Sequence, residues 1–330
     1  MTEINLHALP QTIEGYLHQQ GWISWNRKVL SLEKPGEGNM NVVIRVKLDD
    51  GSLILKQARP YVQKYPQIPA PLERITVESR FYDLADTNEV LSEYLPGVIG
   101  FDPEQYIFAL EDLGETADYT FLYGKGANVE PAELEAAVCF LSQLHHIGFS
   151  DAEKAGFPAN MALRQLNHEH LIVYPYLMDN GFNLDSVQPG LQETAMAYKA
   201  DEELKKQICQ LGERYLASGS TLLHGDYYPG SWLRAGGRFR VIDPEFCFFG
   251  PAEYDYGVMV AHFMLAQLPQ RVIDQALNQY DTGELDMELA AKFTGMEILR
   301  RIIGLAQLPL DLTLDERSLL LTEAAALVKS

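Results

Sequence analysis

The sequence predicts an α+β protein with two lobes, a small and mainly β lobe over residues 1–112 and a larger, mainly α lobe over residues 113–330. In the first third of the chain, apolar and polar residues alternate with a period of two, as in half-buried strands. Over most of the remaining chain, apolar residues recur at helical spacing. A chain of 330 residues is also longer than one ordinary hydrophobic core needs. We therefore expect two lobes, each with a core of its own.

The N-terminal lobe should contain a helix, a strand pair, a second helix and another strand pair. The pattern places them, in this order, over residues 11–20, 29–55, 71–87 and 97–113. Asp49-Asp50-Gly51 supplies the turn of the first strand pair and Pro103 that of the second.

The C-terminal lobe should be built mainly of helices. Period and propensity predict them over residues 131–149, 191–217, 253–268, 287–308 and 314–328. Three short strands interrupt this helical series, over residues 221–223, 231–233 and 238–242, and glycine-bearing loops separate them.

The charge of the chain narrows the classes of partner. With 46 acidic and 26 basic side chains, the formal net charge is −20. Such a field repels nucleic acids and anionic lipid headgroups, so we expect neither nucleic-acid nor membrane binding. A single nucleotide remains compatible, because a metal ion and a few placed cations neutralise phosphates locally.

The N-terminal segment and the cysteines indicate a cytoplasmic protein. Residues 1–20 lack the basic start and apolar stretch of a signal peptide, and the longest apolar run, over residues 256–266, is too short to span a bilayer. The three cysteines are widely separated and lack metal-site spacing, so we expect reduced thiols in the core.

Two acidic motifs, each directly after a short apolar stretch, carry the strongest chemical signal. They are His224-Gly225-Asp226, followed five residues later by Ser231, and Asp243-Pro244-Glu245, which begins seventeen residues after Asp226. Desolvating a carboxylate is costly unless a partner or a metal ion compensates it. Asp243 and Glu245 stand two apart at a strand end, so both can point to one side and bind Mg²⁺. Asp226 would orient an attacking hydroxyl and accept its proton.

Ordinary turns offer an alternative interpretation of both motifs. Asp, Gly and Pro are common turn residues, and a turn explains each triplet taken alone. The two triplets together, with the intervening serine and strand, favour the catalytic interpretation. Asp255 is expected to hold backbone near the Asp226 loop, and the histidines outside the first motif, among them His262, receive no role.

A glycine-rich loop and a lysine form the second signal. Gly36 and Gly38, in the segment GEGNMN, lie between strand-like stretches and would let backbone N–H groups approach a phosphate. Lys56 ends the next strand, and Glu78 on the following helix would hold it towards the phosphates. A hairpin turn explains the glycines equally well, Lys56 can extend to solvent, and Glu78 can be a solvated helix residue.

Arg300 and Arg301 form the third signal. A helical wheel of GMEILRRIIGLAQL places both arginines opposite an apolar arc, with Gly304 between them. A mid-helix glycine costs up to about 1 kcal/mol relative to alanine, so we expect a functional notch flanked by two cations that suits an anionic or oxygen-rich ligand. Two surface arginines are the alternative.

These motifs, in this order, resemble the aminoglycoside phosphotransferase and choline kinase superfamily, and within it most of all the 5-methylthioribose kinase branch. The resemblance rests on GEGNMN, LILKQARPYV, LERITVES, HGDYYPGS, VIDPEFCFFGP and LRRIIGLAQ, which touch both predicted lobes. Most of the superfamily has asparagine where Ser231 stands, whereas serine together with DPEF is similar to the methylthioribose kinase branch. The chain departs from that branch at Tyr227-Tyr228-Pro229 and in its shorter length.

The resemblance implies a protein-kinase-like fold, an ATP-binding N-terminal lobe, and a C-terminal lobe for catalysis and substrate binding. It makes Asp226 the catalytic base, with His224, Arg300 and Arg301 on the substrate side, and Asp243 and Glu245 the magnesium ligands. The residues expected to bind ATP are Gly36, Gly38, Asn39, Asn41, Lys56, Glu78 and Ser231, with adenine against the segment from Glu111 to Leu113. The resemblance also suggests a homodimer.

The sequence thus predicts an ATP- and Mg²⁺-dependent kinase that transfers the γ-phosphoryl group to a hydroxyl of a small molecule, with 5-methylthioribose of methionine salvage as the first candidate. Another sugar, an amino alcohol or an aminoglycoside is the nearest alternative acceptor. A nucleotide-binding module without turnover is the alternative from a different class.

Overall fold

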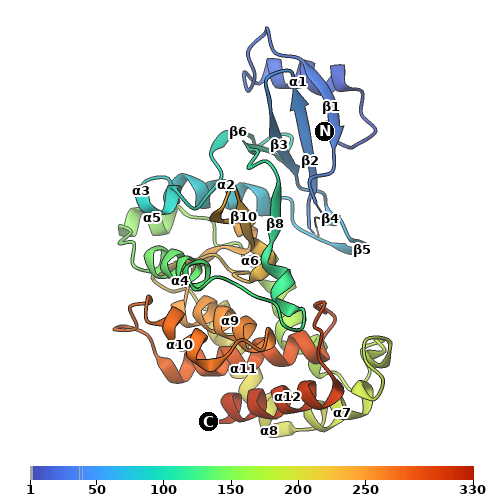
Figure 1. Cartoon of the computed structure of the whole chain (residues 1–330), viewed down its shortest axis with the longest axis vertical. Helices are drawn as coiled ribbons and strands as arrows, with labels where there is room; N and C mark the ends of the chain where they lie inside the picture. The colour runs from blue at the N-terminus through green and yellow to red at the C-terminus, as the bar shows by residue number, and fades with distance from the viewer. Residues whose placement is uncertain (1–2, 37, 39) are drawn as a thin grey trace. The chain divides into compact units, whose positions relative to one another are not determined.

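The computed structural model describes residues 3–36, 38 and 40–330, and it divides the chain into two compact units (Figure 1). The first unit combines Met1–Ala117 with Arg234–Phe246, and the second combines Asp118–Leu233 with Cys247–Ser330. This division differs from a single boundary after residue 112, because the segment that carries Asp243 and Glu245 returns to the first unit.

A five-stranded antiparallel sheet forms the centre of the first unit. Its strand order is β1-β2-β3-β7-β6, with β1 Val29–Glu33, β2 Val42–Leu48, β3 Gly51–Gln57, β7 Ile107–Glu111 and β6 Val98–Asp102. The predicted turn at Asp49 and Asp50 is confirmed, since Leu48 of β2 pairs with Gly51 of β3.

Helix α1 (Pro10–Gln19) and helix α2 (Arg74–Ala85) pack against opposite faces of this sheet. Ile107 and Ala109 of β7 belong to the same buried cluster as Ile13 and Leu17 of α1. The intervening residue Phe108 instead contacts Tyr82 of α2, with ring centroids 5.4 Å apart. Successive residues of a strand point to opposite faces, so Lys56, the β3 partner of Phe108, lies on the α2 face.

Short elements complete the first unit. They are β4 Tyr61–Val62, β5 Tyr65–Pro69, α3 Glu89–Ser92, β11 Arg238–Val241 and the 3₁₀ turn Pro244–Phe246. Strands β8 Thr116–Asp118 and β10 Trp232–Ala235 join β11 in a three-stranded sheet of order β11-β10-β8.

Helices around one large apolar core form the second unit. They are α4 Pro131–His145, α5 Asp151–Gly156, α6 Met161–His168, α7 Leu191–Lys199, α8 Glu202–Leu216, α9 Ala252–Leu265, α10 Gln270–Leu277, α11 Met287–Ile303 and α12 Leu314–Lys329. A π-helical turn, Glu169–Val173, extends α6, and β9 Thr221–Leu223 pairs with β12 Phe248–Gly250. Helix α11 is buried along most of its length and supplies much of the core.

Most predicted elements are confirmed, but the strand pair expected over residues 29–55 is three strands, β12 was not predicted, and the helix expected over residues 287–308 ends at Ile303. A single helix over residues 191–217 was wrong, because the Asp201 side chain accepts a hydrogen bond from the Leu204 N–H at 2.9 Å and starts α8 as a separate helix. Helices α5, α6 and α10 were not predicted, since they are only six to eight residues long and bury at most two residues each.

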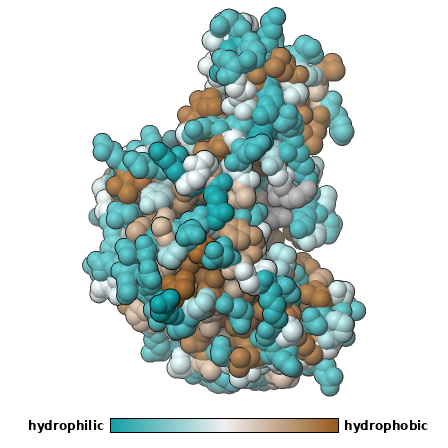
Figure 2. All heavy atoms as spheres, in the orientation of Figure 1, coloured by the Kyte–Doolittle hydropathy of each residue, from teal (hydrophilic) through white to brown (hydrophobic). Residues whose placement is uncertain are grey.

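Hydrophilic side chains dominate the visible face, with hydrophobic residues scattered among them (Figure 2).

The expectation of three core thiols is only partly met. The cysteines are free, but Cys209 is exposed and Cys139 half-buried, so only Cys247 is a core thiol. None of the helices in the described part of the chain combines the length and apolar composition that a membrane crossing requires.

Gly295 allows α11 and α12 to approach each other closely. A Cβ atom there would lie 2.4 Å from the Ala324 carbonyl oxygen of α12, whereas a Cβ at Gly15 in α1 would meet nothing within 4 Å. We expect Gly295→Ala to destabilise the protein by about 1–3 kcal/mol through overpacking. The control Gly15→Ala should stabilise it by about 0.5–1 kcal/mol. Urea unfolding checks both, and a neutral Gly295→Ala would contradict the packing of α11 on α12.

Candidate active site

Lys56 is the centre of the polar cluster in the first unit. Its Nζ donates to Glu78 Oε1 of α2 at 2.9 Å and to Asp243 Oδ1, which follows β11, at 2.7 Å. Only 4% of the Lys56 side chain is exposed, so the alternative that it extends to solvent is wrong. Glu78 is fully buried, so it is not a solvated helix carboxylate either.

The carboxylates keep Lys56 charged. Burial alone would lower the pKa of its ammonium group, but Asp243, Glu78 and Glu245 together raise the pKa well above its ordinary value. A permanent cation at the end of β3 is suited to a phosphate group.

The two carboxylates of the Asp243-Pro244-Glu245 motif lie in different surroundings. Asp243 has a left-handed backbone, with φ 63°, and 48% of its side chain is exposed. Glu245 is buried and accepts a hydrogen bond from Asn41 Nδ2 at 2.8 Å, with Arg74 Nε 3.4 Å from the same oxygen. Asp243 therefore presents its carboxylate outward, while Glu245 is held by protein groups.

Asp243 and Glu245 are the residues of this cluster that could hold a metal ion, one with an exposed carboxylate and one with a buried carboxylate. In the described part of the chain, no cluster of three or more His, Cys, Asp or Glu side chains is arranged to hold a metal ion. Mg²⁺ is commonly bound through one or two carboxylates, with water and phosphate oxygens as the other ligands. The exposed carboxylate of Asp243 satisfies that requirement, with Glu245 as the second candidate.

Arg74 ties the end of the glycine-rich segment to the helix that carries Glu78. Fully buried at the start of α2, it donates from Nε to Asn41 Oδ1 at 2.9 Å, and from Nη2 to the Met40 carbonyl at 3.0 Å. Of the other candidates in this segment, a Cβ atom at Gly36 would meet nothing within 4 Å, whereas one at Gly38 would lie 3.0 Å from the Asn41 carbonyl oxygen. Asn39 lies outside the described residues.

The segment expected near adenine is held by Asp112. Its carboxylate accepts hydrogen bonds from Arg45 Nε at 2.7 Å and from the Gly114 N–H at 3.0 Å. Glu111 is exposed and pairs with Gly97 through its backbone N–H and its side chain, and Leu113 is half-buried. Asp112, which sequence reasoning passed over, therefore sets the local backbone course.

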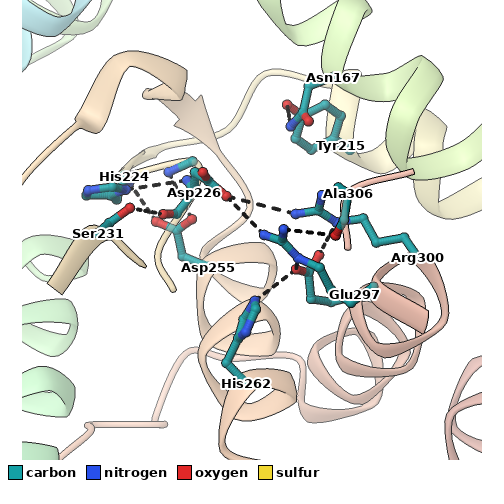
Figure 3. A network of polar contacts seen from close by, with 12 residues as sticks. Asn167, Tyr215, His224, Asp226, Ser231, Asp255, His262, Glu297, Arg300 and Ala306 are labelled. Atoms are coloured by element: carbon teal, nitrogen blue, oxygen red, sulfur yellow. Dashed lines mark hydrogen bonds and ion pairs between the residues drawn. The ribbon is translucent and has the colours of Figure 1, made fainter. Parts of the chain in front are cut away.

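In the second unit, Asp255 of α9 shapes the loop that carries Asp226. Its two carboxylate oxygens accept hydrogen bonds from the His224 N–H at 2.6 Å and the Gly225 N–H at 3.0 Å, which confirms the expectation for Asp255 (Figure 3). Ser231 Oγ donates to the Asp226 carbonyl at 3.0 Å. Gly225 has φ 83°, so the sharp turn suits glycine.

The loop buries His224 and leaves Asp226 accessible. The His224 ring is inside the protein, and its Nδ1 lies 3.4 Å from the Asp226 backbone nitrogen. The side chain of Asp226 is 29% exposed. Backbone contacts thus fix the position of Asp226, while its carboxylate is partly exposed.

Arg300 and Arg301 face the Asp226 carboxylate. Their Nη2 atoms lie 3.9 Å and 3.6 Å from Asp226 Oδ1, and both side chains are buried. Figure 3 shows Arg300 pointing towards Asp226. The alternative of surface arginines is therefore wrong. The expected mid-helix notch is also wrong, because Gly304 ends α11 and a Cβ there would lie 2.4 Å from the Arg300 carbonyl.

Three side chains around the arginine pair were missed by the sequence analysis. Glu297 binds the Nε atoms of both arginines, His262 donates to Glu297, and the Tyr228 ring lies 4.8 Å from the Arg301 guanidinium carbon. Of the three, only Glu297 could have been predicted from the sequence. It precedes the arginines by three and four residues, a spacing that makes side chains neighbours on a helix.

Several methylthioribose kinases are similar in sequence to this chain over most of its length. A methylthioribose kinase of Exiguobacterium sibiricum is 28% identical over 84% of this chain and 80% of its own. Methylthioribose kinases of Yersinia enterocolitica and Oryza sativa are 28% and 29% identical over 76% and 73% of this chain. The alignments span 64% and 57% of the length of these two relatives.

Solved structures share the fold at lower identity. A spectinomycin phosphotransferase in complex with ADP and spectinomycin is 11% identical, covers 98% of both chains and has a TM-score of 0.57. The protein LicA in complex with AMP is 16% identical, covers 96% of this chain and 98% of its own, and has a TM-score of 0.55. The fold is therefore the protein-kinase-like α+β fold. The model of the phosphotransferase enzyme family matches residues 31–290, so the chain belongs to the phosphotransferase enzyme family.

Proposed function

We propose that the protein is an ATP-dependent kinase that phosphorylates a hydroxyl group of a small molecule, with 5-methylthioribose as the first candidate acceptor. Family membership and the names of the relatives support this assignment. The AMP and ADP in the structures of two neighbours support ATP as the phosphoryl donor. The fixed and accessible carboxylate of Asp226 beside two guanidinium groups is the observation that carries the proposal.

The first unit would bind the nucleotide. Lys56, held by Glu78, would contact the phosphates, together with the glycine-rich segment of Gly36, Gly38, Asn39 and Asn41. The backbone between Glu111 and Leu113 would contact adenine. Asp243, with Glu245, would hold Mg²⁺, which neutralises charge on the phosphate oxygens when it is bound.

The second unit would bind and activate the acceptor. Asp226 would accept a hydrogen bond from the attacking hydroxyl and take its proton as the hydroxyl oxygen bonds to the γ-phosphorus of ATP, while the bond from that phosphorus to the β,γ-bridging oxygen breaks and ADP leaves. His224, which was expected on the substrate side, is buried and would instead help to keep the backbone of Asp226 in place. Ser231, which was expected to bind ATP, would do the same through its hydrogen bond to the Asp226 carbonyl. The Nη groups of Arg300 and Arg301 would bind the acceptor oxygens and orient the hydroxyl, so positioning supplies much of the rate enhancement.

The arginine pair also discriminates between the candidate acceptors. Amino alcohols and aminoglycosides carry ammonium groups, which have no lone pair and cannot accept a hydrogen bond from a guanidinium group. The oxygens of a neutral sugar can accept hydrogen bonds from both guanidinium groups. The arginine pair therefore favours 5-methylthioribose or another neutral sugar.

An acceptor panel tests the function directly. With ATP and Mg²⁺, 5-methylthioribose should give acceptor-dependent ADP release and a sugar phosphate visible by ³¹P NMR. Choline and an aminoglycoside should give neither, because their cationic groups cannot accept hydrogen bonds from Arg300 and Arg301. Nucleotide binding without turnover on any acceptor in the panel would favour a binding module instead.

Replacing Asp226 tests the catalytic base. We expect Asp226→Asn to lower kcat by about 10²–10⁴-fold, because the amide cannot take the proton. ATP affinity, measured with a fluorescent nucleotide, should stay nearly unchanged. Asp274→Asn, at an exposed position on α10, is the matched control. Full turnover in Asp226→Asn would remove Asp226 from the mechanism.

Replacing Arg300 tests the acceptor site. Arg300→Lys keeps the charge but loses the planar fork, so we expect the KM for the acceptor to rise by about tenfold or more, with little change for ATP. Steady-state kinetics with each substrate varied in turn provide the measurement, with the exposed Arg271→Lys as control. Equal losses for ATP and acceptor would argue against this role.

A further inference from the structure

We propose that Glu297, supported by His262 and Tyr123, is a positioning residue that fixes the orientation of both arginines towards the acceptor. The inference rests on the proposed function of Asp226, Arg300 and Arg301 and adds the element that sets their geometry. It predicts that acceptor recognition depends on a carboxylate that need not touch the acceptor.

One carboxylate binds the inner edge of both guanidinium groups. Glu297 Oε2 accepts from Arg300 Nε at 2.5 Å, and Oε1 accepts from Arg301 Nε at 2.7 Å (Figure 3). Because each guanidinium is planar, fixing its Nε edge also fixes the direction of its Nη groups. The Nη2 atoms are the ones that face Asp226.

Glu297 is ionised despite its complete burial. Burial alone would raise the pKa of this carboxyl group, but Arg300, Arg301 and the hydrogen bond from His262 lower the pKa well below its ordinary value. The ionised carboxylate can only accept hydrogen bonds, so all three neighbours must donate to it.

This requirement determines the tautomer of His262. Burial lowers the pKa of His262 to about 4, so its ring is neutral near pH 7. Its Nε2 lies 3.0 Å from Glu297 Oε1 and must carry the proton, which leaves Nδ1 as an acceptor. The Tyr123 hydroxyl, 2.6 Å from Nδ1, therefore donates. Tyr123 therefore donates to His262, and His262 donates to Glu297.

A purely structural ion pair explains the arrangement less well. Buried ion pairs are often no more stabilising than apolar residues of the same size, so core stability alone does not call for three charges on one helix. The edge of each guanidinium group that Glu297 contacts also argues for a positioning role. Glu297 occupies the Nε side of each guanidinium, and the Nη side is left towards the half-exposed Asp226.

The length of the Glu297 side chain is part of the inference. One carboxylate on α11 reaches arginines three and four residues further along, on the same face of the helix. Aspartate, one methylene shorter, keeps the charge but withdraws the carboxylate from at least one Nε. Glutamine keeps the shape but loses the charge and one acceptor.

Two variants of Glu297 test the proposal by kinetics. Glu297→Gln and Glu297→Asp should each raise the KM for 5-methylthioribose by about tenfold or more, with the KM for ATP within about twofold. Glu288→Gln, at an exposed position in the first turn of α11, should change neither KM. An unchanged acceptor KM in both Glu297 variants would overturn the proposal.

Tyr123→Phe gives a second test if the Glu297 variants fail to fold. It removes one hydroxyl, leaves Glu297 in place and deprives His262 Nδ1 of its donor. We expect a smaller rise in acceptor KM, about two- to fivefold, and again no change for ATP. Equal changes for both substrates would overturn the proposal.

NMR separates a failure of this inference from a failure of the proposed function, because it needs no turnover. In ¹⁵N-labelled wild-type protein, His262 should be the Nε2–H tautomer, and the Nε–H signals of Arg300 and Arg301 should shift in Glu297→Gln but not in Glu288→Gln. If no acceptor is phosphorylated, the proposed function fails while these signals still test the geometry. An Nδ1–H tautomer, or unshifted Nε–H signals, would overturn the inference by itself.

Discussion

The ion pairs of Lys56 organise the first unit. Lys56 sits on the central strand β3, and its two carboxylate partners come from α2 and from the segment after β11. Removing one partner of a buried ion pair costs about 3–5 kcal/mol, because an uncompensated charge remains inside the protein. The sheet, the helix and the Asp243 segment are therefore constrained by one ammonium group. Arg74 adds a second constraint, since it binds the end of the glycine-rich segment and lies close to Glu245.

The second unit also has a buried ion at the centre of a polar cluster, but of the opposite charge. There the buried central ion is an anion, Glu297, and its partners are two guanidinium groups and a neutral imidazole. In both units, the central ion holds a more exposed group of the opposite kind in place. Lys56 holds Asp243, and Glu297 holds the arginines that face Asp226. These two clusters of buried charge are the places where we propose that the nucleotide phosphates and the acceptor hydroxyl groups bind.

Features that depend on neighbouring residues could be predicted from the sequence. The β2–β3 turn and the helix that carries Glu78 follow from local periodicity. The pairing of Lys56 with Glu78 was predicted from the arrangement in kinases, where a carboxylate on the following helix holds the lysine towards the phosphates. The wheel of α11 separated the arginines from the apolar arc correctly, but it could not show that other elements cover the polar face as well. Asn41 and Glu245 are 204 residues apart, and no local sequence pattern predicts the hydrogen bond between them. Arg74 and His262 were missed for the same reason, since their partners lie far away in sequence.

The central claim is that the cation of Lys56 holds the nucleotide phosphates. Calorimetric titration of ATP with Mg²⁺ into wild type and into Lys56→Met tests it most directly, because methionine keeps the volume and removes the charge. The account predicts a loss of nucleotide affinity of about tenfold or more, with the Nε–H signals of Arg300 and Arg301 unchanged. Equal nucleotide affinity in a folded Lys56→Met variant would contradict the account.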